Sequence, residues 1–309
     1  MQTLELPKSL STKQAVIATL AYFDLFGIPL TRAEISEHLF FLEPDEQKID
    51  IYLKESPLVR QHDGYFSLQG DEAFFLNFYK KKERARDYWK RVKRYQWLFS
   101  ICPFVELVAV CNSLPLEDVN ENSDIDLFIV AKKGKLFTAR FFLTLLTQIF
   151  GVRRHGNKVK KRFCLSFYVT DEMLDFAKLA QQPFDIYLAY WIKTLEPISG
   201  DLQLYENFLK TNSEWLKHYF VSESRPRRRF FKKRTEKQEQ WKTRLENWFG
   251  AEEWEKRFQN KQWNRIQEKY QNLHEKSGTV LSKDMLKFHD QDIRAEIKDR
   301  WMKRVDALL

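Results

Sequence analysis

The sequence predicts an α+β protein in which a small mixed sheet lies between an N-terminal unit of helices and a hairpin and a C-terminal helical region. Strand-like apolar runs at 104–110, 123–130 and 162–170, with a helical stretch at 135–150, indicate a mixed sheet with helices packed against it. The chain of 309 residues is long enough for two or three domains with a sizeable core. From residue 171 onward we expect almost only amphipathic helices.

The first seventy residues predict a compact unit of three helices and a hairpin. The helices are expected over 12–26, 31–39 and 44–55. Thr31 and Glu34 form a capping box that opens the second helix. The turn sequence His62-Asp63-Gly64 separates two strand-like segments and predicts a β-hairpin. Three helices followed by a hairpin are the order of a winged-helix-like domain.

This unit has two readings, a winged-helix nucleic-acid-binding regulator and a structural or protein-contact module. The third helix, which would enter a DNA groove, carries an excess of acidic side chains, among them Glu46, Asp50 and Glu55. A negative helix is repelled by DNA phosphates. We therefore favour the structural role and keep nucleic-acid binding as the alternative.

The net charge of +9 is concentrated in the basic segments 80–94, 153–162 and 225–237. Such segments attract polyanions, either the phosphates of a nucleotide or the backbone of RNA or DNA. A solvated surface is the alternative for each of them. We also expect a charged helix from residue 71 to 99, which contains the first segment.

Several features point to a cytoplasmic protein that has no membrane partner. Cys102, Cys111 and Cys164 are irregularly spaced in apolar surroundings, which is typical of reduced core cysteines. Residues 1–10 contain no apolar signal segment. The most apolar helical stretch, 141–150, is too short to cross a bilayer.

Asp124 and Asp126 are the most informative residues of the chain. Side chains two apart on a strand point to the same face, so these carboxylates should lie side by side. Ile125, Leu127 and Ile129 should face the other way, into the core. Two neighbouring negative charges are unfavourable without a cation between them. A divalent cation that carries a phosphate fits this need.

The segment Val108–Val130, VAVCNSLPLEDVNENSDIDLFIV, resembles the nucleotidyltransferase superfamily, which includes DNA polymerase beta and small bacterial antibiotic nucleotidyltransferases. The family motif is an apolar strand, Gly-Ser, a loop of about ten residues and Asp-x-Asp on the second strand. The form Ser-Asp-Ile-Asp-Leu is typical of the minimal members. As a fold the resemblance covers roughly residues 85–170. More loosely it extends to about 220, where two segments look like the helical extension of uncharacterised prokaryotic members.

The resemblance implies a small mixed-sheet nucleotidyltransferase core that moves a nucleotide from a nucleoside triphosphate, with ATP expected, to an acceptor. It makes Asp124 and Asp126 the catalytic residues and the ligands of Mg²⁺ or Mn²⁺. The residues that it implies for holding the triphosphate are Asn112, Ser113, Ser123, Lys133 and Arg140. Ordinary surface charge is the alternative for the last two.

Two departures from the family motif bear on activity. Asn112 replaces the family glycine, although asparagine tolerates positive φ better than most residues. Ser166 stands at the alternating position of the third strand, where active members place a third carboxylate. Asp171 and Glu172 lie a few residues beyond this position, after the third strand, and are expected to begin the next helix. A catalytically degenerate protein that binds nucleotide and metal is therefore the alternative function, and the acceptor is open.

The expected organisation follows from these patterns. We predict the winged-helix-like domain over 1–70 and the nucleotidyltransferase-like core with its leading long helix over 71–172. A helical extension should follow over 173–222, and a basic linker with a helical tail over 223–309.

Overall fold

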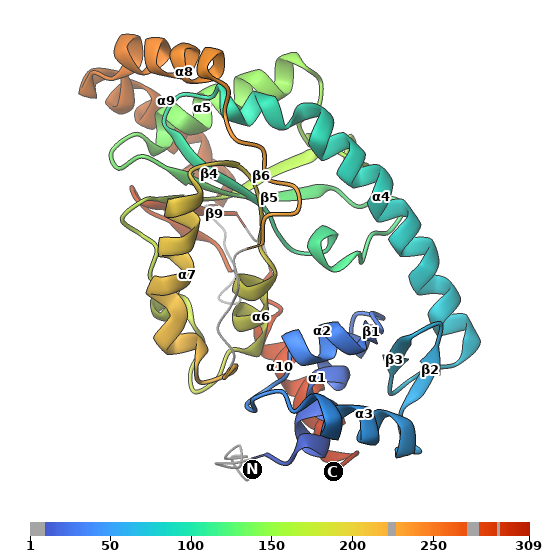
Figure 1. Cartoon of the computed structure of the whole chain (residues 1–309). Helices are drawn as coiled ribbons and strands as arrows, with labels where there is room; N and C mark the ends of the chain where they lie inside the picture. Colours follow the sequence, from blue (N-terminus) through green and yellow to red (C-terminus); the bar gives the residue numbers. More distant parts are fainter. Residues whose placement is uncertain (1–9, 222–226, 271–277, 289–290) are drawn as a thin grey trace.

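The chain folds into a mixed α+β structure around one six-stranded sheet (Figure 1). The computed structural model describes residues 10–221, 227–270, 278–288 and 291–309. Residues 1–9, which include the start of the N-terminal unit and most of the segment inspected for a signal sequence, lie outside the described residues. So do residues 225 and 226 of the third basic segment.

The N-terminal part has the helix and hairpin order that the sequence predicts. Its elements are α1 (Thr12–Asp24), β1 (Leu30–Thr31), α2 (Arg32–Glu37), α3 (Glu46–Glu55), β2 (Arg60–His62) and β3 (Tyr65–Ser67). The predicted capping box at Thr31 and Glu34 opens α2. One additional strand, β1, pairs with β3 and makes an antiparallel sheet in the order β1-β3-β2. The winged-helix assignment itself stays a prediction.

The central sheet has the strand order β7-β4-β5-β6-β9-β8. Its strands are β4 (Val105–Val110), β5 (Ile125–Ala131), β6 (Phe163–Thr170), β7 (Glu196–Gly200), β8 (Val280–Leu281) and β9 (Met285–Lys287). β5 is antiparallel to β4 and parallel to β6, and α5 (Leu136–Ile149) makes the crossover between β5 and β6. The strand, turn, strand, helix, strand order predicted for residues 104–170 is therefore confirmed.

The pairing of β5 with β6 contains a bulge. Asp126 lies opposite Cys164, but two positions later Phe128 lies opposite Phe167, so β6 has one extra residue. The bulge reverses the alternation of side chains, and Phe163 and Phe167 belong to different hydrophobic clusters. Alternate residues from Phe163 to Val169 therefore do not all share one face of the sheet.

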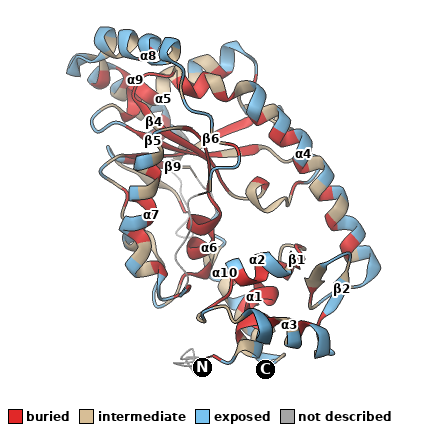
Figure 2. Ribbon diagram, viewed as in Figure 1, coloured by how far each residue is buried: buried red, intermediate tan, exposed pale blue. Residues whose placement is uncertain are grey.

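Helices cover both faces of the central sheet. One face packs against α4 (Glu72–Ser100) and α5, with α8 (Glu236–Phe249) and α9 (Glu252–Tyr270) beside them. The other face packs against α6 (Ile186–Thr194) and α7 (Leu202–Leu216), and its core continues into the N-terminal part. Figure 2 shows the buried residues along the strands and on the inner sides of these helices.

The C-terminal region is not almost only helical, which corrects the expectation for the residues after 171. It supplies β7, β8 and β9 to the central sheet, and these strands are only 5, 2 and 3 residues long. The last helix, α10 (Arg294–Asp306), lies beside α1 (Figure 1). The buried Trp301 donates its indole N–H to the carbonyl of Ala18 at 2.9 Å. The two ends of the described chain therefore pack together.

Among the described helices, none combines the length and the apolar composition that a membrane span requires.

Candidate functional site

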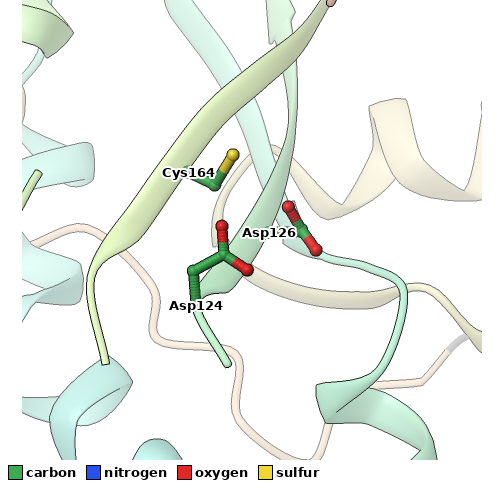
Figure 3. A group of neighbouring side chains, drawn as sticks. All are labelled: Asp124, Asp126 and Cys164. Atoms are coloured by element: carbon green, nitrogen blue, oxygen red, sulfur yellow. The ribbon is translucent and has the colours of Figure 1, made fainter. Parts of the chain in front are cut away.

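Asp124, Asp126 and Cys164 converge at one end of the parallel strand pair (Figure 3). Asp124 immediately precedes β5, Asp126 lies in β5, and Cys164 comes from β6. One oxygen of each carboxylate and the Cys164 sulfur all lie within 4.8 Å of one another. Ile125, Leu127 and Ile129 are buried in the cluster on the other face, so the predicted side-by-side carboxylates are confirmed. This group could hold a metal ion.

Burial is the main influence on the charge state of the carboxylate pair. Burial, followed by the negative charge of Asp124, raises the pKa of Asp126 to about 6. Hydrogen bonds from Asn112 and Cys164 and the charge of Arg154 oppose this rise without cancelling it. Arg154 donates from Nη1 to Oδ2 of Asp124 at 2.7 Å. The Arg154 guanidinium therefore forms an ion pair with Asp124 and also lowers the pKa of Asp126.

Cys164 and Ser166 of β6 both line the groove that contains Asp124 and Asp126. Cys164 lies opposite Asp126 in the strand register, and the bulge follows this pair. Burial, with Asp126 and Asp124 nearby, raises the pKa of the Cys164 thiol to about 12. The thiol is therefore neutral at physiological pH and is no substitute for a third carboxylate.

Asn112 adopts the backbone conformation that its position requires. Its φ is 60°, in the left-handed region that asparagine tolerates better than most residues. Its side chain also acts: Oδ1 accepts the indole N–H of Trp191 at 2.9 Å, and a second hydrogen bond from Asn112 lowers the pKa of Asp126. Asn112 thus holds Asp126 in place.

The structure brings some of the predicted phosphate-binding residues to the carboxylate pair and leaves others away from it. Ser113 directly precedes the short 3₁₀ helix η1 (Leu114–Leu116) and lines a neighbouring cavity. The hydroxyl of Ser123 accepts the backbone N–H of Asn120 and closes the loop before β5. Arg140 lines the same groove as the two carboxylates.

Lys133 is not brought to the site. It follows the far end of β5, seven positions beyond Asp126, which corresponds to roughly 20 Å along an extended chain. Its ammonium pairs with Glu172 at 2.7 Å, and its backbone N–H donates to Asp171. Lys133 therefore lies beyond the opposite end of β5 from the carboxylate pair.

The carboxylate pair opens into a groove of about 1050 Å³ with a strongly basic lining. Its cationic side chains are Arg140, Arg153, Arg154, Lys261 and Arg265. Asp124 and Asp126 are the only acidic side chains among its described lining residues. Five cations around two carboxylates produce a positive potential that attracts an anionic ligand.

The sequence analysis did not identify Arg154, Cys164, Lys261 and Arg265 individually. Arg154 belongs to the basic segment 153–162, whose charge pointed to it. Lys261 and Arg265 are four residues apart and share one face of α9, but no local pattern places that face at the sheet. Glu255 of α9 accepts the backbone N–H groups of Phe137 and Thr138 at the start of α5, which fixes α9 against the groove.

The other two basic segments mainly form contacts within the chain. In segment 80–94, Lys81 pairs with Asp118 at 2.6 Å. In the described part of segment 225–237, Arg227 pairs with Glu37 at 3.1 Å, and Arg234 donates to the carbonyl of Val105. Much of this charge holds elements together, and the groove-lining arginines of segment 153–162 are the ones best placed for an external anion.

Comparison of the chain with models of protein families, with curated proteins and with solved structures found no match.

Proposed function

We propose that this protein binds a metal-complexed nucleoside triphosphate in the basic groove and transfers its nucleotidyl group to an acceptor. The observation that carries the proposal is the carboxylate pair in a groove lined by five cations. A triphosphate with a divalent cation matches both parts, because its phosphates need positive charge and its cation needs carboxylate oxygens. The residue order from Val108 to Val130 supports the same conclusion.

The residues present fit a divalent cation such as Mg²⁺ or Mn²⁺. Two carboxylates converge, and the negative charge of Asp124 helps to raise the pKa of Asp126, so a second positive charge is favourable there. A cation held by Asp124 and Asp126 would neutralise charge that develops on the transferring phosphate.

The remaining residues would bind and orient the nucleotide. Arg140 and Arg153 line the groove and can hold phosphate oxygens, while Lys261 and Arg265 supply charge from α9. Asn112 keeps Asp126 oriented through its hydrogen bond. These contacts favour ATP or another triphosphate without selecting a base.

Binding without transfer is the second candidate, and Cys164 is the observation that favours it. A neutral thiol stands where a third carboxylate would accept the proton of an acceptor hydroxyl. A protein with this site could hold a metal-bound nucleotide and act as a nucleotide sensor.

The deciding experiment measures thermal stability and pyrophosphate release with each nucleoside triphosphate and Mg²⁺ or Mn²⁺. A ligand at one hundred times its Kd stabilises the native state by about 2.7 kcal/mol. We expect this stabilisation in the parent protein and its loss in Asp124→Asn. Glu172→Gln is the matched control, because Glu172 is an exposed carboxylate at the far end of the sheet.

The outcomes separate the candidates. Pyrophosphate release that Asp124→Asn abolishes supports transfer. Stabilisation without release in the presence of varied acceptors supports the binding role. If no triphosphate and no cation changes the melting temperature at millimolar concentration, both candidates fail.

A further inference from the structure

A second cavity, of about 340 Å³, adjoins the basic groove and has a different lining. Its lining includes six aromatic side chains from three distant parts of the chain: Tyr22 of α1 and Phe26 just after it, Phe167 of β6, and Tyr187, Tyr190 and Trp191 of α6. Tyr22 stacks on Tyr190 with ring centroids 4.2 Å apart, and Phe167 lies 5.5 Å from Trp191. Flat aromatic walls favour a planar ligand.

The cavity is linked to the carboxylate pair through Asn112, which lines both spaces. Trp191 donates its indole N–H to Asn112 at 2.9 Å, and Asn112 is hydrogen-bonded to Asp126. A molecule that stacks on Trp191 is therefore separated from the proposed reaction site by one side chain.

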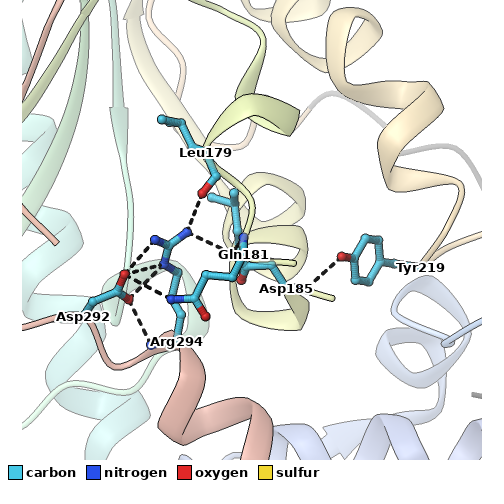
Figure 4. Close-up of polar contacts among 7 residues, drawn as sticks. Leu179, Gln181, Asp185, Tyr219, Asp292 and Arg294 are labelled. Atoms are coloured by element: carbon cyan, nitrogen blue, oxygen red, sulfur yellow. Dashed lines mark hydrogen bonds and ion pairs between the residues drawn. The ribbon is translucent and has the colours of Figure 1, made fainter. Parts of the chain in front are cut away.

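Asp292 and Arg294, which line the cavity, belong to an ion-pair network (Figure 4). Arg294, at the start of α10, pairs with Asp292 at 2.7 Å and with Asp185 at 2.8 Å. Asp185 caps α6 by accepting the N–H of Leu188, and its own N–H donates to the Tyr219 hydroxyl. The network joins α6 to α10, so the wall that α6 carries is preformed.

Lys287 is held near the ion-pair network but takes no direct part in it, although the charges of Asp292 and Asp185 favour its charged form. Arg294 is paired as described, and Asp118 pairs with Lys81. Lys287 lines the cavity from β9 and forms no ion pair with any described residue. Its ammonium lies 5.8 Å from the centre of the Phe167 ring, and burial lowers its pKa. An anionic group in the cavity would form the direct ion pair that Lys287 lacks.

We propose that the aromatic cavity is the acceptor site and that the acceptor is a planar aromatic molecule with one negative charge, which pairs with Lys287. The acceptor role in this inference rests on the proposed function. A neutral nucleobase would fill the aromatic space but leave Lys287 unpaired, so the observations favour an aromatic acid. The N-terminal part, through Tyr22 and Phe26, then serves as a wall of the substrate site.

The test uses two fluorescent probes with the same ring system, 6-hydroxy-2-naphthoate and uncharged 2-naphthol, titrated into the full-length protein. A hydrogen bond to a charged group changes affinity by at least about tenfold. We expect the naphthoate to bind at least about tenfold more tightly than the naphthol. Lys287→Met should remove this difference and leave the affinity for naphthol unchanged.

Two further variants keep the result interpretable. Lys261→Met removes a cation of the basic groove and should leave naphthoate binding unchanged, because Lys261 does not line the aromatic cavity. Leu116→Trp should fill the cavity from the half-exposed η1 and abolish binding of both probes. Thermal melts of each variant confirm that it is folded.

The decisive comparison adds Mg²⁺ and α,β-methylene ATP, which cannot transfer its nucleotidyl group. Undiminished naphthoate binding with the nucleotide present supports separate acceptor and nucleotide sites. Competition between the two, equal affinity for both probes, or an unchanged preference in Lys287→Met overturns the inference. If the nucleotide stabilises the protein but neither probe binds, the acceptor site is wrong while the proposed function stands. If the naphthoate binds but no nucleotide does, the acceptor role falls together with the proposed function.

Discussion

Replacing Asp126 with asparagine should stabilise the protein at neutral pH, because the folded state disfavours the charged form of this carboxyl group. The pKa of Asp126 is raised from an ordinary 3.8 to about 6 by burial and by the charge of Asp124. The folded state therefore binds this proton more tightly than the unfolded chain does. The contribution of Asp126 to stability is present below pH 3.8 and is lost as the pH rises through about 6.

The size of the effect follows from the shift in pKa. A shift of about two pH units corresponds to about 3 kcal/mol of stability lost above pH 6 in the parent protein. Asparagine does not ionise, so Asp126→Asn avoids this loss and can still interact with Asn112. We expect the variant to be more stable than the parent by up to about 3 kcal/mol at pH 8, with little difference near pH 4.

The assay is urea unfolding of the parent and the variant between pH 4 and pH 8, followed by circular dichroism. The free energies of unfolding must be compared as differences at each pH, because burial also raises the pKa of Asp24 to about 6 and makes the parent pH-dependent. Subtraction cancels that contribution. The difference in unfolding free energy between Glu172→Gln and the parent should not change with pH, since Glu172 is an exposed carboxylate near the opposite end of β5.

Two results would refute the reasoning. A difference that does not change with pH would mean that Asp126 titrates normally in the folded state. A variant less stable than the parent at pH 8 would mean that the contacts with Asn112 and Arg154 outweigh the burial of the charge. The same variant links stability to function: saturating Mg²⁺ should stabilise the parent by about 2.7 kcal/mol at one hundred times Kd, and the Asp126→Asn variant much less.

The other predictions concern residues that support the two cavities. Arg294→Met should cost about 3–5 kcal/mol in urea unfolding, because it leaves the buried Asp185 without its ion-pair partner, whereas Arg300→Met on the exposed side of the same helix should cost less than about 1 kcal/mol. Asn112→Ala should be less stable than Asn112→Gly by about 1 kcal/mol, since both lose the amide but only alanine is strained at a φ of 60°. Cys164→Asp should strengthen Mg²⁺ binding in isothermal titration calorimetry and lower the stability of the metal-free protein at pH 8, because it adds a third carboxylate to the pair; unchanged Mg²⁺ affinity would argue against a metal site.

Local patterns in the sequence were sufficient for the features that depend on neighbouring residues. The two-residue period of a strand placed Asp124 and Asp126 on one face and their apolar neighbours on the other. The capping box at Thr31 and Glu34 marked the start of α2. The conformational tolerance of asparagine anticipated the positive φ of Asn112.

The same local rule failed where pairing between strands overrides alternation. One extra residue in β6 places Phe163 and Phe167 on different faces of the sheet, and nothing in the residues of β6 alone marks the bulge. The short strands β7, β8 and β9 were missed because two to five residues carry too little periodicity to be distinguished from a helix or loop.

By itself, then, the sequence determined the α+β class, the carboxylate pair and the turn at Asn112, because each depends on residues within a few positions of one another. Only the tertiary structure decided what surrounds them. It placed Lys133 far from the pair, brought Lys261 and Arg265 to the groove, and set Tyr22 against Tyr190. Those placements depend on packing between segments as much as about 170 residues apart, and side-chain periodicity carries no record of such long-range contacts.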